Sequence, residues 1–412
     1  MAKKQKIRTK SDLRRTVILA VLASLVVLFG ALYAASRTFA RVQMSNLADV
    51  FTAFSVKDDS TFPYMADAAS VVRMVPVGSG AAVLRADKLD ILTKSGAVLQ
   101  SVPHTYVSPA VDVCAGRTLL YDRGGSRYMI LSKTGILRAE SEAQGDILTA
   151  ALASDGRFAI ATTAKSAKKG EQNSALAAAL GADDSAAETT ANGAKSVLTV
   201  YTAKGAKFFQ YKCVSEYVTD VAFTRKGVAL TVAGVKNAET HSRLLILDFK
   251  MTEAKADLAY DDTSFFHVQS DGSTVIACSR DLLTRVHGKT QEDTRFDSDT
   301  LQFFCADDAG KSTLVLLTYG NEHAAHLLGL QKNGETAFDT KCSEKIKAAS
   351  RSGSYTSVLT DSAVRTYNNS GSEVGTLKIT EPAQDICLSD RTVFVLFPDR
   401  IESFPAAGAH TQ

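Results

Sequence analysis

The stretch VVRMVPVGSGAAVLRADKLDILTKSG, residues 71–96, contains three apolar segments separated by short turns. A Gly-Ser-Gly turn at 78–80 follows the first segment, and a Lys-Ser-Gly turn at 94–96 follows the third. Glycine reaches positive φ without strain, and short apolar segments joined by such turns are typical of an antiparallel meander. The stretch therefore predicts three strands of a small sheet, after which a weaker fourth strand begins.

The same unit recurs along the chain, with most intervals between 38 and 45 residues and one of 71. Eight units of this size match the blades of a β-propeller, so the predicted fold is all-β with eight blades. Seven blades remain the alternative if residues 68–101 are irregular, and two packed sandwiches would not predict such even spacing. The first turn of each unit is marked by Gly78, Gly116, Gly156, Gly227, Gly272, Gly310, Gly353 and Asp390.

The last unit lacks a fourth strand, since only PAAGAHTQ follows the strand at Ile401–Phe404. Before the first unit, Phe51–Val56 (FTAFSV) is a strand-like segment without a partner. Closing the ring removes exposed sheet edges, so we expect Phe51–Val56 to pair beside Ile401–Phe404.

Residues 165–195 interrupt the third unit between its second and third strands. They are rich in Ala, Ser, Gly and charged residues and contain no aromatic residue. Such a segment cannot bury enough apolar surface to order itself, so it is predicted to be a disordered insertion. It is interpreted as a passive loop, with a tether that binds a partner as the alternative.

The N-terminal region predicts a membrane anchor. Residues 17–35 (VILAVLASLVVLFGALYAA) contain no charge and match the thickness of a bilayer as one helix. Lys and Arg are concentrated before this segment, which places the N-terminus in the cytoplasm. A cleaved signal peptide is the alternative, although nineteen apolar residues exceed its usual core. The predicted parts are a cytoplasmic tail (1–16), a transmembrane helix (17–35), a linker (36–50), an extracellular propeller (51–405) and a C-terminal tail (406–412).

The charge distribution argues against nucleic-acid binding. Nine of the 47 basic residues, but one of the 44 acidic residues, fall within residues 1–41. The rest of the chain therefore has a slight acidic excess, whereas binding to phosphates needs a basic face.

Metal-ligating and redox motifs are also missing. The six cysteines are far apart, form no CxxC pair, and lie mostly in strand-like runs, so they are interpreted as buried thiols; disulfides remain open because the domain is predicted to be exported. His323 and His326 (HAAH) have no further ligand nearby in sequence and are expected in a loop between strands. No metal site and no cofactor is predicted.

Catalytic motifs such as GxSxG, HExxH or a Walker loop do not follow a suitable strand. The predicted innermost strands supply five polar candidates for a converging site. We expect three of them, which hold equivalent places in their units, to brace the blades by bonding backbone amides. A catalytic residue is normally needed once, so the repetition of these residues predicts a structural role for them. The chain is therefore predicted not to be an enzyme. The five are Arg73, Asp112, Asp220, His267 and Asp385.

In repeat length and turn placement the chain resembles PQQ-like and WD40-like propellers, although it contains no tryptophan. With its basic N-terminus and single apolar segment, it is most similar to uncharacterised membrane-anchored propeller proteins of Gram-positive bacteria. This resemblance implies a binding or scaffold module at the cell envelope, with a protein or glycan partner. The alternatives are an envelope glycan hydrolase or lyase that uses loop carboxylates, and a sensor coupled to the membrane.

Overall fold

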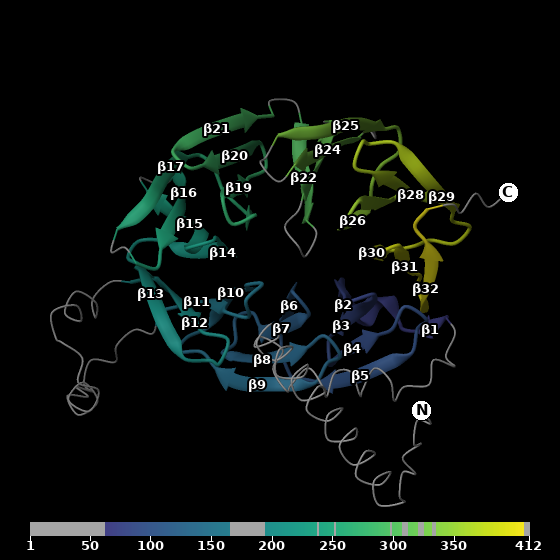
Figure 1. The fold of residues 1–412 in the computed structure, drawn as a ribbon, viewed down its shortest axis with the longest axis horizontal. Coiled ribbons are helices and arrows are strands. Elements are labelled where there is room, and N and C mark those ends of the chain that lie inside the picture. Colours follow the sequence, from purple (N-terminus) through teal and green to yellow (C-terminus); the bar gives the residue numbers. More distant parts are fainter. Residues whose placement is uncertain are drawn as a thin grey trace, which may run out of the picture. The chain divides into compact units, whose positions relative to one another are not determined.

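The computed structural model describes residues 62–164, 194–236, 239–250, 253–296, 299–306, 312–319, 325–331 and 335–407. In this part of the chain, eight four-stranded antiparallel sheets form a β-propeller, which confirms the predicted fold and blade count. Figure 1 shows the sheets around a central axis, with the first strand of each nearest the axis and the fourth at the perimeter.

The first four sheets follow the order of the chain. Sheet 1 contains β2 (Val71–Val77), β3 (Gly80–Arg85), β4 (Lys88–Leu92) and β5 (Val98–Pro103). Sheet 2 contains β6 (Pro109–Cys114), β7 (Arg117–Asp122), β8 (Arg127–Ser132) and β9 (Leu137–Glu142). Sheet 3 contains β10 (Ile147–Leu152), β11 (Phe158–Thr163), β12 (Ser196–Tyr201) and β13 (Lys207–Cys213). Sheet 4 contains β14 (Tyr217–Phe223), β15 (Gly227–Lys236), β16 (Glu239–Asp248) and β17 (Ala254–Asp261).

The last four sheets continue the pattern until the ring closes. Sheet 5 contains β18 (His267–Ser270), β19 (Thr274–Cys278), β20 (Leu282–His287) and β21 (Thr290–Arg295). Sheet 6 contains β22 (Asp299–Ala306), β23 (Ser312–Tyr319), β24 (Ala325–Gln331) and β25 (Thr336–Cys342). Sheet 7 contains β26 (Ala348–Ser352), β27 (Tyr355–Leu359), β28 (Ala363–Asn368) and β29 (Glu373–Lys378). Sheet 8 contains β30 (Asp385–Ser389), β31 (Thr392–Leu396), β32 (Arg400–Pro405) and β1 (Tyr64–Met65). A short 3₁₀ helix, η1 (Ala68–Ser70), joins β1 to β2.

The antiparallel order gives the propeller two faces. The turn face carries the turns that join first to second and third to fourth strands. The loop face carries the connections from second to third strands and those that lead from one sheet to the next. In sheet 3, for example, the turn at 153–157 lies on the turn face, and the connection between β11 and β12 lies on the loop face.

The core consists of eight apolar clusters, one at each junction between neighbouring sheets. Strand β3 illustrates why the strands carry apolar side chains on both faces. Its Ala81 and Val83 pack toward sheet 8, whereas Ala82 and Leu84 pack toward sheet 2. Successive side chains of a strand point to opposite faces, so a sheet covered on both sides needs apolar residues at both. Each sheet is therefore stabilised by its two neighbours.

The N-terminal part of the described chain closes the ring, but not with the expected segment. Tyr64 pairs with Ile401, and Met65 pairs with Arg400, so Tyr64–Met65 is the outer strand of sheet 8. The assignment of this place to Phe51–Val56 was wrong, and that segment lies outside the described residues. The FTAFSV pattern resembles a strand locally, whereas β1 is two residues long and its position depends on tertiary contacts.

Those contacts reach both sheets that meet at the closure. The Phe62 ring lies 5.8 Å from the ring of Phe394 in sheet 8. The Tyr64 hydroxyl donates to Asp90 Oδ2 in sheet 1 at 2.7 Å. Burial, together with this carboxylate, raises the pKa of Tyr64 to about 12, so the phenol stays protonated as a donor. The two-residue strand thus joins sheet 8 to sheet 1.

The insertion interrupts sheet 3 between its second and third strands, as predicted. Thr163 pairs directly with Ser196, and Ala164 N donates to Lys195 O at 2.9 Å. The intervening residues 165–193 lie outside the described part of the chain, so their predicted disorder stays a prediction.

Because the hairpin is already closed at its base, deleting residues 166–193 should change the melting temperature by less than about 2 °C. Differential scanning calorimetry measures this change. A drop of many degrees would show that the insertion packs on the propeller.

Two further expectations concern the membrane and the cysteines. Among the described residues, no helix is long and apolar enough to cross a membrane, and residues 17–35 lie outside them. Cys213, Cys278, Cys342 and Cys387 are buried free thiols, and the Cys114 side chain is half-buried. Burial raises the pKa of Cys213 to about 11 and also raises the pKa of Cys278 well above its ordinary value, which keeps these thiols protonated and unreactive.

Candidate functional site

Five polar residues of the inner strands form one electrostatically coupled set. His267 begins β18, Asp385 begins β30, and Arg73 is the third residue of β2, so all three lie toward the loop face. The Arg73 guanidinium interacts with both Asp385 and Asp112. Asp112 in turn interacts with Asp220, which contacts His267 Nδ1 at 2.7 Å. The structure therefore brings together all five predicted candidates.

The three carboxylates are engaged with backbone amides of the next sheet. Asp112 Oδ2 accepts from Leu152 N at 2.7 Å, and Asp220 Oδ2 accepts from Val268 N at 2.9 Å. Asp385 accepts from Met74 N across the closure. Each also accepts from the amide that follows it in the chain. The predicted bracing role is confirmed, and each brace joins the first strands of two sheets.

The sequence predicts that Asp112, Asp220 and Asp385 hold equivalent places in their units, and this prediction is only partly right. Asp112 lies two residues before the end of β6, whereas Asp385 lies four residues before the end of β30. Ser350, two residues before the end of β26, matches the level of Asp112, and its Oγ accepts from Leu388 N at 2.9 Å. The side chain that bonds the next sheet can therefore lie two or four residues before the end of the inner strand, and a serine hydroxyl can take the place of the carboxylate. The sequence pattern missed Ser350 because a serine in a strand carries no distinctive signal.

Burial dominates the electrostatics of these carboxylates. Desolvation raises the pKa of Asp112, and the bonds from Leu152 N and Val113 N counteract it in part. Desolvation likewise raises the pKa of Asp385. General acids and bases need a carboxylate that can reach a substrate. Here each carboxylate accepts from two backbone amides, so the set is suited to holding sheets together.

We expect Asp112→Asn and Asp385→Asn each to lower the free energy of unfolding by about 1–3 kcal/mol, because the new NH₂ group faces an amide N–H. The loss should depend on pH. The folded-state pKa of both carboxyls lies above its ordinary value of 3.8. Wild-type stability from these groups is therefore full below about pH 4 and falls as the pH rises through the folded-state pKa. Urea unfolding should show the penalty shrinking from pH 4 to pH 7.

Ser350→Ala is the matched control, because it removes a brace that does not titrate in this range. It should cost about 1 kcal/mol at every pH. A penalty for Asp112→Asn that grows toward neutral pH would contradict the assignment.

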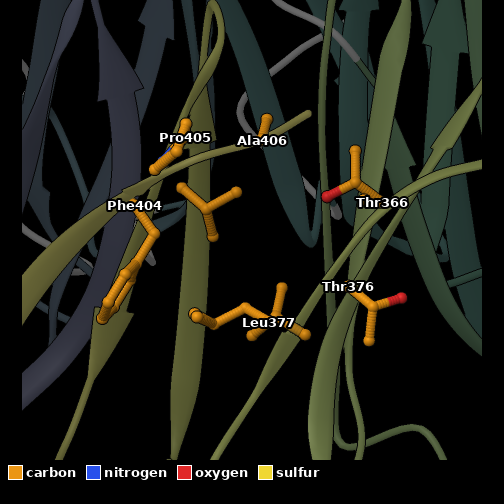
Figure 2. Close-up of a pocket in the computed structure, with 9 residues that line it drawn as sticks. Thr366, Thr376, Leu377, Phe404, Pro405 and Ala406 are labelled. Carbon is orange, nitrogen blue, oxygen red and sulfur yellow. The ribbon is translucent and has the colours of Figure 1, made fainter. Parts of the chain in front are cut away.

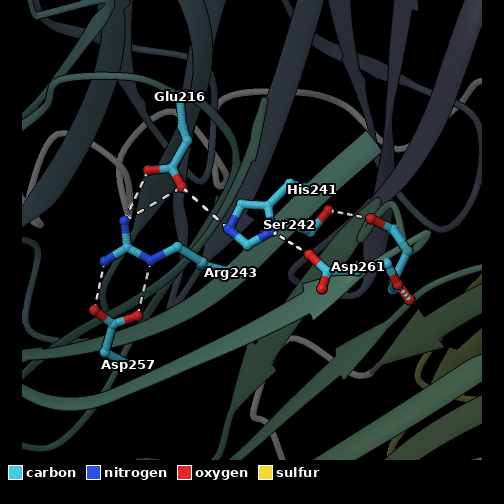
Figure 3. A network of polar contacts seen from close by, with 7 residues as sticks. Glu216, His241, Ser242, Arg243, Asp257 and Asp261 are labelled. Atoms are coloured by element: carbon cyan, nitrogen blue, oxygen red, sulfur yellow. Dashed lines mark hydrogen bonds and ion pairs between the residues drawn. The ribbon is translucent and has the colours of Figure 1, made fainter. Parts of the chain in front are cut away.

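A second polar cluster lies at the loop face of sheet 4 (Figure 3). Arg243 in β16 donates to both oxygens of Asp257 in β17, at 2.8 and 2.5 Å. Its Nη1 donates to Glu216, just before β14, at 2.9 Å from Oε2. His241 Nε2 lies 3.8 Å from the same Glu216, and its Nδ1 contacts Asp261 at 3.0 Å. Glu216 is 5% exposed, so its charge depends on these partners.

The same arrangement recurs in sheet 7, which favours a structural role. Arg365 in β28 donates to Glu344, just before β26, at 2.7 Å and pairs with Glu373 in β29. The hydrogen bond from Arg365 and that from Ser362 lower the pKa of Glu344 to about 2. In both sheets, an arginine of the third strand ties the incoming loop to the outer strand. Sequence reasoning missed the Glu216–Arg243 and Glu344–Arg365 pairs because they link residues 27 and 21 positions apart.

The loop face also carries most of the exposed apolar surface. Tyr217 begins β14 and Phe266 directly precedes β18, and these two inner strands are joined by the bond from Val268 N to Asp220. Val235 stands close to the end of β15 in the same sheet as Tyr217. Of the ten large apolar side chains that are exposed in the described chain, seven lie at this face: Met65, Val72, Val107, Val214, Tyr217, Val235 and Phe266.

Small-molecule and metal sites find little support among the described residues. Figure 2 shows a cavity between sheets 7 and 8, with Thr366, Leu377 and Phe404 in its lining. Its volume of about 10 Å³ holds one water molecule at most. His326 lies within β24, not in a loop as expected, and contacts Asp339 at 2.7 Å. His323 is outside the described residues, and the described part of the chain contains no group of three metal-binding side chains.

Comparison with known proteins agrees with the fold. A family model described as "Family of unknown function (DUF5711)" matches residues 178–404, more than half of the chain. No curated protein matches the sequence. Among solved structures, Saccharomyces cerevisiae Sqt1 is 8% identical with a TM-score of 0.55, over 85% of this chain and 100% of its own.

Two further solved structures are similar. The C-terminal WD40 domain of Sif2 is 9% identical with a TM-score of 0.55, over 85% of this chain and 99% of its own. BamB from Moraxella catarrhalis is 12% identical with a TM-score of 0.48, over 83% of this chain and 98% of its own. At these identities, the likeness to Sqt1 and to the Sif2 domain shows the propeller fold alone.

Proposed function

Because the chain belongs to a family of unknown function (DUF5711), we propose its role from its own surface: a binding or scaffold module that holds a protein partner on its loop face. The observation that carries this proposal is the distribution of exposed apolar side chains, seven of ten on one face. Four of the seven, Val214, Tyr217, Val235 and Phe266, lie on the neighbouring elements between the end of β13 and the start of β18. Neighbouring exposed apolar groups mark interaction sites, and aromatic anchors such as Tyr217 and Phe266 contribute most to binding.

The polar contacts that hold the loop before Tyr217 in place fit the role of a binding module. The Glu216–Arg243–Asp257 contacts fix the loop before Tyr217 to the outer strand of sheet 4. A Lys195 ammonium also lies 5.7 Å above the Tyr217 ring. A surface held in place loses little conformational entropy on binding. The alternative, a glycan hydrolase or lyase, would act through carboxylates on the loops. The carboxylates that converge at the inner strands, Asp112, Asp220 and Asp385, are engaged with backbone amides. We therefore propose a module without enzymatic activity.

We propose further that the module acts outside the cell, at the envelope. The support comes from the sequence: residues 17–35 have the length and apolar character of a membrane span, and basic residues precede them. In this arrangement the N-terminus is cytoplasmic, and the partner is an envelope protein.

One experiment tests both location and binding face. Phe266→Cys and Leu137→Cys place thiols of similar exposure, 46% and 50% for the native residues, on the loop face and on the turn-face end of β9. Intact cells are treated with a charged maleimide–diazirine reagent that cannot cross the membrane and are then illuminated. Both thiols should react, and Phe266→Cys alone should yield a discrete cross-linked protein.

The two parts of the proposal fail separately. Absence of labelling at both positions in intact cells, with labelling after lysis, would reject the extracellular location. Labelling at both positions, with an identical cross-linking pattern, would reject the loop face as the binding surface. Adding Val235→Asp to Phe266→Cys should abolish the adduct while leaving the melting temperature unchanged.

A further inference from the structure

The turn face carries an aromatic and basic patch at the junction of sheets 3 and 4. The Arg157 guanidinium lies over three phenyl rings, 5.1 Å from the centroid of Phe249, 5.7 Å from Phe223 and 5.9 Å from Phe208. Phe208 also packs edge-on against Phe249 at 4.9 Å. Phe209, Phe223 and Phe249 pack in part against the core between the sheets. Phe208 lies at an irregularity of β13, between the partners of Val200 and Tyr201, and is 42% exposed.

The rim of this patch is basic. Five exposed cations stand in the surrounding turns and form no ion pair with a described residue; they are Lys204, Lys207, Arg225, Lys226 and Lys250. The nearby acidic groups are fewer. Asp155 is paired with Arg157 at 2.7 Å, and Asp248 accepts from Lys250 N. Asp271, in the turn whose Gly272 O accepts from Arg225 N, accepts from Ser273 N and Thr274 N, and Glu253 is exposed. The patch is therefore net positive, although the chain beyond residue 41 has an acidic excess.

The described chain also begins on this face. A Cβ placed on Gly96, in the turn between β4 and β5, would lie 3.2 Å from the Phe62 ring. Phe62 therefore stands at the turn face, and the residues before it connect to the propeller there. An exposed ring surrounded by lysine and arginine suits an extended anionic surface with an apolar interior.

We propose that this patch docks the turn face onto a bilayer that contains anionic lipid, with Phe208 at the interface and the five cations on the headgroups. The loop face, on the opposite side of the propeller, is then left open for a protein partner. The proposal concerns a different surface from the proposed function, so either can fail without the other.

The absence of tryptophan from the chain provides a selective test. Phe208→Trp reports from the patch, and Phe266→Trp reports from the loop face with similar exposure. The full chain is combined, by detergent dialysis, with vesicles of phosphatidylcholine alone or with 30% phosphatidylglycerol, with and without brominated acyl chains. We expect the Phe208→Trp emission to shift to the blue by several nanometres and to be quenched by brominated lipid in the anionic vesicles alone. Phe266→Trp should give the same spectrum in both.

The charge requirement is tested with Arg225→Glu/Lys226→Glu, whose exposed side chains form no ion pair with any described residue. This double change, or 1 M salt, should abolish the blue shift of Phe208→Trp. If Phe208→Trp does not fold, Ala206→Trp in the neighbouring turn replaces it. The proposal is rejected if the patch reporter behaves alike in neutral and anionic vesicles, or if both reporters respond equally. A blue shift of the Phe208→Trp emission with soluble polyglutamate in the absence of lipid would show that the patch binds an acidic polymer. That result would reject docking onto a bilayer.

Discussion

Replacing Phe62–Ala66 with a Gly/Ser segment of equal length should lower the free energy of unfolding by about 5 kcal/mol or more. The loss has two sources. Phe62 and Tyr64 pack partly buried against the core between sheets 8 and 1, so the loss of each ring costs about half of the 1.5–3 kcal/mol of a fully buried side chain. The bond from Tyr64 to Asp90 ends on a carboxylate that is 1% exposed, and loss of a donor to a buried charge costs about 1.5–3 kcal/mol.

The backbone contributes as well, because Ala66 N donates to Asp399 O at 3.0 Å and β1 pairs with β32. Thermal unfolding measured by circular dichroism gives the change. The same replacement over 51–56 is the control and should have a much smaller effect. An equal or larger loss from the control would restore Phe51–Val56 as a candidate for the closing strand.

Arg243→Met should be the most damaging single substitution on the loop face, with a loss of about 3–5 kcal/mol. The change leaves the buried Glu216 without the guanidinium Nη1 that donates to it, and an uncompensated buried charge is costly. The double variant Glu216→Gln/Arg243→Met should recover most of the loss, because no charge then remains to be solvated. Urea unfolding of the two single variants and the double variant measures the coupling.

Arg295→Met provides the comparison. Arg295 pairs with Asp281 at 3.6 Å, and both side chains are more than half exposed. Such surface pairs contribute about 0–1 kcal/mol. If Arg243→Met were as mild as Arg295→Met, the cluster at Glu216 would not support the surface around Tyr217.

The sequence predicted those parts of the fold that follow from local patterns. Turns around Gly78 and Gly116 repeat at a nearly constant interval, and a repeated meander has few ways to bury both faces of each sheet. The closing strand escaped prediction because Tyr64–Met65 has no pattern of its own. Its place depends on Asp90 and Phe394, which are distant in the sequence.

Among the polar residues, too, those with a local sequence pattern were predicted, and those that depend on contacts between distant segments were not. Asp112, Asp220 and Asp385 were recognised because each precedes an apolar strand segment, and their bracing role followed from their repetition. The Glu216–Arg243 pair and the patch at Phe208 were missed, since each depends on which turns and strands meet at a junction. The spacing of the repeats predicts the order of the sheets, whereas the side-chain contacts between sheets depend on how the sheets pack in the closed propeller.

The position of β1 has a consequence for biosynthesis. Tyr64 and its partner Ile401 lie near opposite ends of the described chain, so a ribosome synthesises one long before the other. Every intermediate of translation therefore carries β1 without its partner strand and an uncovered apolar flank on sheet 1. An unfinished or truncated chain presents these surfaces to chaperones and proteases, and only the finished chain hides them. The two-residue strand thus makes protection from degradation conditional on synthesis of the last sheet.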